Sequence, residues 1–425
     1  MSLGAERVAA SLDAIDRNWR AGGACVALSG GLDSSVLLHL MAALAQAGDF
    51  RLRALHVDHG LQSGSAGWAE ACRSSCALLH VPLRVLTLGL VPARGESVEA
   101  VAREARRLAL AAALEPDERL LTAQHRDDQL ETVLIQLLRG AGVTGLAAMP
   151  ARTGFGPGWQ LRPLLDVDRA EIRAYAAQHG IAWHDDPMNA DARFDRGWLR
   201  ARVLPAIRER WPAAAATVSR SAAHLAEASR LLDAVAAADA VNLLDDGRVS
   251  LAGLAGLARD RQVNLLRWWV RQSGLRPPPA SQLGAALPGF FTARPDAAPR
   301  LSWPDGDMRR YRGRLYAIPR LQEPGSFKLI DTLEGGLRRP SASPIEVRFR
   351  TGGESLKPHP GRPRKRLKDL CQEAGIVPWM REQLPLVFVG GKLAAVGDLW
   401  IDADFAVPPG EPALRPVWSG RPRIY

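Results

Sequence analysis

Short apolar runs alternate with longer amphipathic stretches along residues 23–150 of the sequence. This rhythm is typical of βα units, in which buried strands alternate with helices that cover a parallel sheet. Predicted strands cover residues 24–28, 53–57, 83–88 and 119–123, and predicted helices cover residues 34–47, 65–79, 97–114 and 127–139. Glycine and proline accumulate over residues 140–163, which we interpret as loops that leave the sheet.

The pattern changes after Trp211. Residues 211–240 are rich in alanine and residues 259–272 are amphipathic, which favours a helical middle region. Further strands are predicted at residues 314–318, 345–350, 386–389 and 393–396, and a linker rich in glycine, serine and proline at 335–344. We therefore expect an α/β parallel-sheet domain over residues 1–210, a mainly helical middle domain over 211–325 and a small α+β C-terminal domain over 340–425.

Size and charge add a weaker constraint on function. The 425 residues exceed what one hydrophobic core usually serves, which agrees with several domains. Fifty-five Lys and Arg against 45 Asp and Glu give a net charge of +10, which favours a polyanionic partner such as a nucleic acid. A generally basic, arginine-rich proteome explains the same charge equally well.

Cysteine usage and hydropathy predict the compartment. Cys25, Cys72, Cys76 and Cys371 are too few and too scattered for a disulfide framework, so we expect buried thiols in a reducing compartment, the cytoplasm. No apolar run approaches the ~20 residues that a membrane span needs, and the charged amino terminus does not resemble a signal peptide. We therefore expect a soluble protein without a membrane partner.

The most informative stretch is Ser-Gly-Gly-Leu-Asp-Ser-Ser at residues 29–35, between a predicted buried strand and a predicted helix. A turn at this place directs backbone N–H groups and a helix N-terminus towards one point, where phosphate groups are stabilised. No lysine follows, so the stretch is not a Walker-type phosphate loop. The structural alternative is a tight turn with Asp33 or Ser34 as a helix cap.

This run resembles the SGGxDS loop of the PP-loop ATP pyrophosphatases, which cleave ATP between its α- and β-phosphates and adenylate a substrate. The resemblance implies an ATP site in which Asp33 helps to place Mg²⁺. His56 and Asp58 end the next strand at the carboxyl edge of the sheet, where ligands bind, so we expect contacts to ribose or adenine. The predicted ATP-binding residues are Ser29, Gly30, Gly31, Leu32, Asp33, Ser34, His56 and Asp58.

A second constellation lies where another predicted strand passes into a helix, at residues 122–132. Helical spacing places Asp127 or Asp128 within one turn of Glu131. Acids beside a triphosphate can hold Mg²⁺ or orient a nucleophile. Acidic capping of the helix is the structural alternative, although His125 at the strand end is not explained by capping.

This constellation resembles the HHxDDQxET motif of the tRNA(Ile)-lysidine synthetases, with Gln124 in place of the first histidine. Residues 138–146 continue that family's pattern, as do Arg162-Pro163-Leu164 and the segments 185–189 and 194–200. Two positions depart from it, because Met188 stands for serine and Gly197 for asparagine. The departures put particular hydrogen bonds in doubt while leaving Asn189, Arg196 and Arg200 in place.

The resemblance implies a carbon–nitrogen ligase that adenylates the wobble cytidine of a CAU-anticodon tRNA(Ile), after which free L-lysine displaces AMP to give lysidine. ATP and Mg²⁺ are implied as co-substrate and cofactor. Which of Asp127, Asp128 and Glu131 holds metal or orients lysine stays open. The implied catalytic residues are Asp33, His125, Asp128, Glu131 and Arg196, and the implied tRNA-binding residues include Arg139, Asn189 and Arg200.

The C-terminal region carries a run of cations without an intervening acid, from Arg362 to Lys368. Clustered cations bind nucleic-acid phosphates, so we expect Arg364, Lys365 and Arg366 to contact tRNA. A solvated loop is the alternative. Two other functions also remain open: a PP-loop tRNA sulfur transferase, although the usual CxxC pair is missing, and a non-catalytic RNA-binding protein on the same fold.

Overall fold

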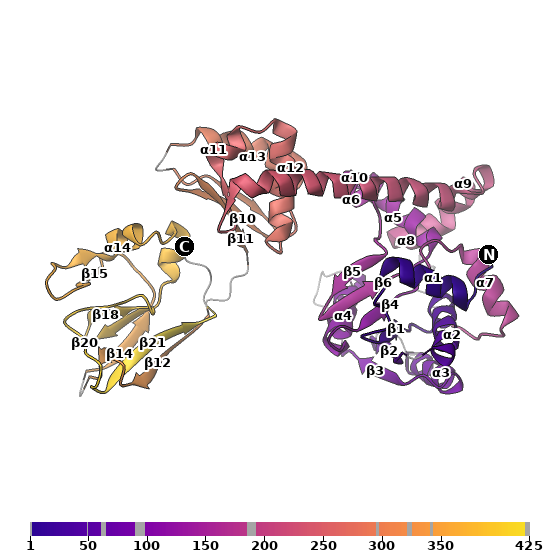
Figure 1. Cartoon of the computed structure of the whole chain (residues 1–425), viewed down its shortest axis with the longest axis horizontal. Helices are drawn as coiled ribbons and strands as arrows, with labels where there is room; N and C mark the ends of the chain where they lie inside the picture. The colour runs from indigo at the N-terminus through magenta and orange to yellow at the C-terminus, as the bar shows by residue number, and fades with distance from the viewer. Residues whose placement is uncertain are drawn as a thin grey trace. The chain divides into compact units, whose positions relative to one another are not determined.

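A computed structural model describes residues 2–48, 50–60, 65–89, 98–184, 193–294, 297–320, 325–340 and 343–420. The chain forms two compact units, Met1–Leu232 and Asp233–Tyr425 (Figure 1). Each unit has its own sheets and hydrophobic cores, and each is considered by itself below. No helix in the described part of the chain is long and apolar enough to cross a bilayer.

The first unit is built on a six-stranded sheet with the order β3-β2-β1-β4-β6-β5. Its strands are β1 (Ala24–Ala27), β2 (Leu52–Asp58), β3 (Leu83–Thr87), β4 (Arg119–Leu121), β5 (Arg152–Phe155) and β6 (Gly158–Leu161). All neighbouring pairs are parallel except β5 with β6. The predicted α/β parallel-sheet fold is confirmed, with strand bounds within two residues of those expected for β1 to β4.

Helices follow the strands as the apolar periodicity predicts (Figure 1). Those of the first unit are α1 (Ala5–Ile15), α2 (Leu32–Ala47), α3 (Ser65–Leu78), α4 (Val98–Ala113), α5 (Arg126–Leu138), α6 (Val143–Leu146), α7 (Arg169–Gln178), α8 (Asp195–Trp198), the π-helical turn η2 (Leu199–Val203) and α9 (Leu204–Arg210). The long helix α10 (Ala214–Leu243) contains the boundary between the units.

Both faces of the sheet are covered, which explains why β1 is apolar throughout. Val26 belongs to the core that α1, α2 and α7 also line, whereas its neighbours Cys25 and Ala27 belong to a second core with Leu110 of α4. Successive side chains of a strand point to opposite faces, so these two cores lie on opposite sides of the sheet. Packing of this kind fixes the carboxyl edge of the sheet, where the loops after β1 and β4 emerge.

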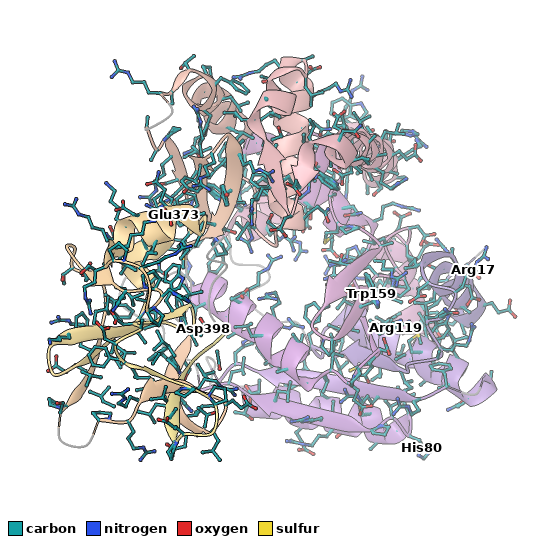
Figure 2. The ribbon with its side chains drawn as sticks, turned by 60° about the vertical axis from the view of Figure 1, so that its left-hand side comes forward. Arg17, His80, Arg119, Trp159, Glu373 and Asp398 are labelled. Atoms are coloured by element: carbon teal, nitrogen blue, oxygen red, sulfur yellow. The ribbon has the colours of Figure 1, made fainter. Side chains whose placement is uncertain are left out.

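The expectation that residues 140–163 are loops was wrong. They contain α6 and the antiparallel pair β5 and β6, and β6 extends the sheet by pairing with β4. Arg152 lies over the ring of Trp159 at 3.9 Å, which joins the two strands by a cation–π contact. Trp159 pairs in register with Arg119 at the amino edge of the sheet (Figure 2). Each strand has only four residues, too few for a periodic pattern to outweigh the glycines.

A group of titratable rings joins α2 to α7. The His39 Nδ1 and Tyr175 hydroxyl lie 3.0 Å apart, and the His179 ring packs on both of them. Burial, together with the nearby His179, lowers the pKa of His39 below its ordinary value of 6.5. The folded state therefore favours the neutral imidazole.

This lowered pKa predicts the direction of a pH effect on stability. The unfolded chain binds more protons at His39 than the folded chain, so its stabilising contribution is complete above pH 6.5 and is lost as pH falls below that value. We expect His39→Gln, which keeps a partner for Tyr175, to reduce the drop in melting temperature between about pH 7.5 and pH 5.5. Circular-dichroism melts of the parent and the variant measure this drop. An equal drop in the two proteins would contradict a contribution of His39 to the pH dependence of stability.

The second unit begins with an antiparallel sheet of order β7-β8-β11-β10-β9. Its elements are β7 (Leu244–Asp245), β8 (Arg248–Ser250), α11 (Leu251–Ala255), α12 (Arg259–Gln272), α13 (Ala280–Thr292), β9 (Arg300–Trp303), β10 (Gly306–Tyr311) and β11 (Arg314–Pro319). Leu265 and Trp269 of α12 and Leu283 and Phe290 of α13 pack with Met308 of the sheet in one core. The predicted helical middle region is confirmed, with α12 at the expected residues.

The rest of the second unit consists of small sheets with two short helices. One sheet has the order β12-β21-β13-β20 and another the order β14-β17-β18-β19. The elements are β12 (Ser326–Thr332), β13 (Gly336–Arg338), β14 (Ile345–Arg348), β15 (Ser355–Leu356), β16 (Lys365–Arg366), α14 (Leu367–Glu373), η3 (Pro378–Gln383), β17 (Leu386–Val389), β18 (Lys392–Val396), β19 (Trp400–Ile401), β20 (Ala406–Val407) and β21 (Ala413–Ser419). This arrangement is the predicted small α+β module.

Candidate functional site

The loop between β1 and α2 forms the first part of the site. Gly30 has a φ of +81°, a left-handed conformation that glycine adopts without strain. A Cβ built on Gly30 would lie 3.1 Å from the Cys72 sulfur, so packing below the loop also excludes a side chain. Gly30 is itself buried and its carbonyl accepts the His184 N–H at 2.9 Å, so the loop is held close to the sheet.

Two serine hydroxyls brace this loop from inside. Ser34 Oγ accepts the Ser29 backbone N–H at 3.1 Å and lies 3.1 Å from the carbonyl oxygen of Gly31, to which it donates. The Ser29 and Ser34 hydroxyls are 2.9 Å apart. Helix α2 starts at Leu32 and runs for 16 residues, so its positive N-terminal end lies at the loop. This geometry suits a phosphate group.

Asp33 stands in the first turn of α2 with one unsatisfied oxygen. Its Oδ1 is buried and has no hydrogen-bond partner among the described residues, whereas Oδ2 lies 3.6 Å from His125 Nε2. A buried carboxylate oxygen without a partner needs an explanation, because leaving it unsatisfied is costly. A cation or a ligand group bound at the loop would supply one.

His125 connects the loop to the acidic motif. It ends the segment after β4, is 2% exposed, and its Nε2 lies 3.5 Å from Asp128 Oδ2. Burial by itself disfavours the imidazolium, but Asp33, Asp128 and Asp127 outweigh it and raise the pKa of His125. The predicted residues Asp33, His125 and Asp128 are thus brought together at the carboxyl edge of the sheet.

Arg200 clamps two acids of α5. Its Nε and Nη2 donate to the two Glu131 oxygens at 2.5 and 2.9 Å, and Nη2 also donates to Asp128 Oδ1 at 3.1 Å. Glu131 is 2% exposed, and burial raises its pKa although Arg200 acts in the opposite direction. Asp128 also accepts the His125 backbone N–H at 3.0 Å, so it caps α5 as well as binding Arg200.

Asp127 is engaged elsewhere. Its carboxylate accepts the Arg169 backbone N–H at 3.0 Å and forms an ion pair with Arg208 of α9. Burial tends to raise the pKa of Asp127, but these two donors lower it overall. Asp127 therefore fixes α7 and α9 against α5, whereas Asp128 and Glu131 both pair with Arg200. Arg208 carried no motif signal in the sequence.

The remaining predicted residues of this unit are distributed around the centre. Arg196 donates to Thr132 of α5 at 3.2 Å, and Arg139 pairs with Asp195 at 2.8 Å on the surface. Asn189 lies outside the described residues. These contacts and those of Arg200 join α8 and η2 to α5, and their order shows that the two segments run antiparallel to α5.

His56 and Asp58 serve the loop from the neighbouring strand. His56 is 4% exposed and donates from Nδ1 to the Leu28 carbonyl at 2.9 Å, with the Cys72 sulfur 3.5 Å away. Burial lowers its pKa, which favours the neutral ring. Asp58 accepts the Gly60 N–H at 2.9 Å and shapes the turn after β2. Their direct contact with a nucleotide stays a prediction.

The C-terminal cations have partners that the sequence did not reveal. Arg364 pairs with Asp402 at 3.1 Å and with Asp404 at 3.3 Å, and Lys365 pairs with Glu373. Arg366 is exposed and makes no ion pair with a described residue. Binding of tRNA by these three residues stays a prediction, with Arg366 the most available cation.

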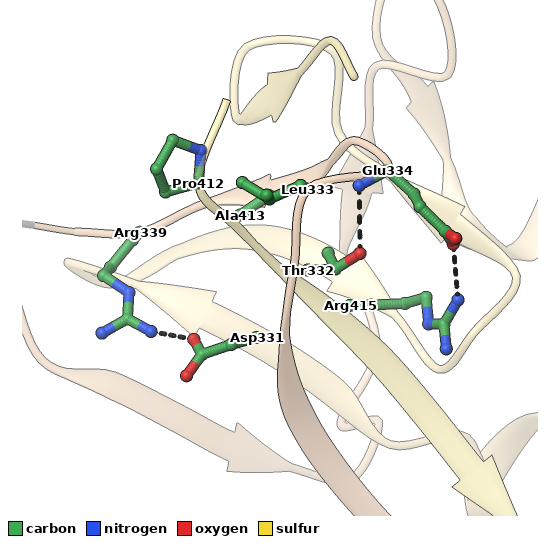
Figure 3. A pocket seen from close by; sticks show the side chains of 8 residues that line it. All are labelled: Asp331, Thr332, Leu333, Glu334, Arg339, Pro412, Ala413 and Arg415. Atoms are coloured by element: carbon green, nitrogen blue, oxygen red, sulfur yellow. Dashed lines mark hydrogen bonds and ion pairs between the residues drawn. The ribbon is translucent and has the colours of Figure 1, made fainter. Parts of the chain in front are cut away.

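A hollow of about 560 Å³ lies in the C-terminal module, between the end of β12 and β21 (Figure 3). Its charged groups pair with one another, Arg339 with Asp331 and Arg415 with Glu334 at 3.0 Å. It contains none of the motif residues, and its charges are already satisfied. The motif residues at the edge of the first sheet therefore form the better candidate.

The donor set suits a metal ion only in part. Within the described ranges no group of three His, Cys, Asp or Glu side chains is placed to hold a metal ion by itself. Asp33 Oδ1 nevertheless offers one free carboxylate oxygen at the phosphate loop. Mg²⁺ commonly binds through one or two carboxylates together with substrate phosphates, and the loop fits that mode.

Comparison with known proteins agrees with this geometry. Family models described as a PP-loop domain, a TilS substrate binding domain and a TilS substrate C-terminal domain match residues 5–207, 250–316 and 345–418. The tRNA(Ile)-lysidine synthase of Alkalilimnicola ehrlichii is 41% identical over 415 residues, covering 92% of both chains. That of Methylococcus capsulatus is 40% identical, covering 93% of this chain and 95% of its own. The Pseudomonas aeruginosa enzyme is 43% identical, covering 90% and 91%.

Proposed function

The chain belongs to the tRNA(Ile)-lysidine synthase family of ATP-dependent PP-loop enzymes, and from this premise we propose that it converts the wobble cytidine of a CAU-anticodon tRNA(Ile) to lysidine. In the first step the cytidine O2 attacks the α-phosphorus of ATP and pyrophosphate leaves. In the second step the ε-amine of free L-lysine attacks C2, the C2–O bond breaks and AMP leaves. The amine loses its protons to nearby bases.

The loop after β1 binds the phosphates in this proposal. The N-terminus of α2, with the N–H groups of its first turn, would stabilise the charge that develops on pyrophosphate. Asp33 Oδ1 would hold Mg²⁺ through ATP, and the ion, when bound, neutralises phosphate charge. The observation that carries the proposal is the unsatisfied Oδ1 of Asp33 beside a braced phosphate loop, with the other oxygen, Oδ2, 3.6 Å from His125.

The acids of α5 bind and deprotonate the lysine amine in this proposal. Asp128, 3.5 Å from His125, and Glu131, paired with Arg200, supply the negative charge that would attract the ammonium of lysine, and the Asp128 carboxylate would accept a proton from it. Arg200 holds both acids in place. His125, whose pKa is raised by Asp33, Asp128 and Asp127, would donate a hydrogen bond to the α-phosphate. Positioning and electrostatics thus supply most of the rate enhancement.

The proposal is tested by product formation. Purified protein is incubated with ATP, Mg²⁺, labelled lysine and either tRNA(Ile) with a CAU anticodon or the methionine tRNA with the same anticodon. We expect labelled lysidine after nuclease digestion, together with AMP and pyrophosphate, from tRNA(Ile). Absence of lysidine with active ATP cleavage would reject the proposed product.

The cysteines argue against the sulfur-transferase alternative. All four are free and buried, and burial raises the pKa of Cys25 and Cys72 to about 12. A persulfide-carrying or disulfide-forming cysteine needs an accessible thiolate. The relatives are lysidine synthases, which favours the same conclusion. Free buried thiols also suit a reducing compartment, and we propose the cytoplasm.

Substitution of the basic C-terminal segment is expected to weaken tRNA binding. Arg364→Ala/Lys365→Ala/Arg366→Ala removes up to three phosphate contacts, and each lost contact reduces the slope of log K against log salt by about 0.9. The KM for tRNA should rise while ATP affinity stays constant. Because Arg364 and Lys365 already pair with acids, Arg366→Ala alone should cause much of the change.

Filter binding of tRNA at several salt concentrations measures this effect. The control is Arg339→Ala/Arg415→Ala, which removes two exposed cations of the same module that are also ion-paired. An equal change in slope for both variants would mean that the segment acts only through the general charge of the module.

A further inference from the structure

The turn that brings Arg200 to the acids also exposes a tryptophan. Arg196 and Arg200 are four residues apart and both contact α5, whereas Trp198 lies midway between them. Residues two positions apart on a helix point to nearly opposite sides, so Trp198 faces away from α5. Its side chain is 50% exposed. The buried contacts of this segment are made by Gly197 and Leu199 instead.

Exposure of a large aromatic side chain here is unusual, because tryptophan is highly buried on average. Arg202 follows one turn later on the same side, is exposed, and makes no ion pair with any residue that the structure describes. A bare indole beside an uncompensated guanidinium offers a π-face together with a positive charge. That pairing is complementary to a nucleobase and its phosphate.

The backbone conformation next to Trp198 also points to a functional surface. Residues Leu199–Val203 form a π-helical turn directly after Trp198. Such turns are rare and are frequent at functional sites. This one carries Arg200 towards Glu131 and leaves Trp198 and Arg202 on the outer surface. The tryptophan and the catalytic acids are separated by about one helix diameter, roughly 10 Å.

We propose that Trp198 is a stacking platform for an unpaired base of the substrate RNA, adjacent to the base that reacts, and that Arg202 contacts a phosphate of the same strand. The proposal rests on the proposed function for its substrate, and it adds a binding residue that the family pattern does not assign. An unpaired base of an anticodon loop has both faces available for stacking. A protein partner would call for apolar neighbours and not for an unpaired cation.

The test compares three substitutions at one position. Trp198→Phe keeps an aromatic face, Trp198→Leu keeps apolar area without a face, and Trp198→Ala removes both. Stacking on one aromatic side chain predicts that the Leu and Ala variants raise the Kd and KM for tRNA(Ile) about tenfold or more, while Phe stays within about threefold. Affinity for ATP and the kcat at saturating tRNA should change little. Arg202→Gln should lower the salt slope by about one.

Trp159→Ala provides a matched control. Trp159 is also an exposed tryptophan beside an arginine, but it pairs in register with Arg119 at the amino edge of the sheet, whereas the site lies at the carboxyl edge. The Trp159→Ala variant should bind tRNA with the same affinity as the parent protein. Unchanged tRNA affinity in Trp198→Ala, or a Leu variant as tight as the Phe variant, would overturn the platform. If the parent forms no lysidine yet Trp198→Ala and Trp198→Leu still lose RNA binding, the proposed function fails and the platform stands.

Discussion

Replacing Asp33 by alanine is expected to lower pyrophosphate release by more than about 1000-fold while the protein stays folded. The side chain is 32% exposed and its Oδ1 has no partner, so its removal takes away no packing and only a weak contact with His125. The same oxygen is the one that we propose holds Mg²⁺ through ATP at the phosphate loop. The effect should therefore appear in chemistry and not in stability.

Pyrophosphate release with ATP, lysine and tRNA measures the rate, and thermal melts measure stability. Asp33→Asn serves as a second variant, because it keeps the shape and removes the charge. Asp166→Asn is the control, since Asp166 is an exposed acid of the same unit whose carboxylate pairs with Arg7 at 3.6 Å. Turnover close to that of the parent in Asp33→Ala would remove Asp33 from the ATP site.

Glu131→Gln is expected to lower kcat about 100-fold or more with a modest change in melting temperature. Glutamine fills the same buried space and still accepts a hydrogen bond from Arg200, which keeps Asp128 as a counter-ion at 3.1 Å. The arginine is therefore not left as an unpaired buried charge, which would cost several kcal/mol. What is lost is the negative charge that we propose attracts the lysine ammonium.

The first unit offers a matched comparison in Glu118. Its carboxylate is also buried and accepts two hydrogen bonds from one arginine, Arg53, at 2.6 and 2.5 Å, but it precedes β4 at the amino edge of the sheet. Glu118→Gln should reduce stability and leave kcat unchanged. If Glu131→Gln behaves in the same way, the Glu131–Arg200 pair is structural.

Local patterns in the sequence were sufficient for the first sheet and for the phosphate loop. The strands around Val26 and Leu55 are apolar on both faces, and the helices between them carry clear periodicity, so β1 to β4 and α2 to α5 were predictable. The motif at residues 29–35 predicted the loop because each of its features is consecutive in sequence. The site residues Asp33, His125 and Asp128 then meet because parallel strands end at one edge.

Contacts between distant residues could not be predicted. The acid Asp127 meets Arg208 across 81 positions, and Arg364 meets Asp404 across 40, with no local signal for either pair. The basic C-terminal run therefore looked free in the sequence although two of its cations are paired. Such pairs depend on how helices and sheets pack, which single-sequence periodicity does not encode.

The contact below the phosphate loop has a consequence for how this sequence can change over evolutionary time. The Cys72 sulfur occupies the space under Gly30 and also approaches His56. A bulkier residue at position 72 would push the loop upward, and a side chain at position 30 would meet the sulfur as well as a strained φ. We therefore expect substitutions at positions 30, 56 and 72 to depend on one another, because the Cys72 sulfur contacts both the loop and His56.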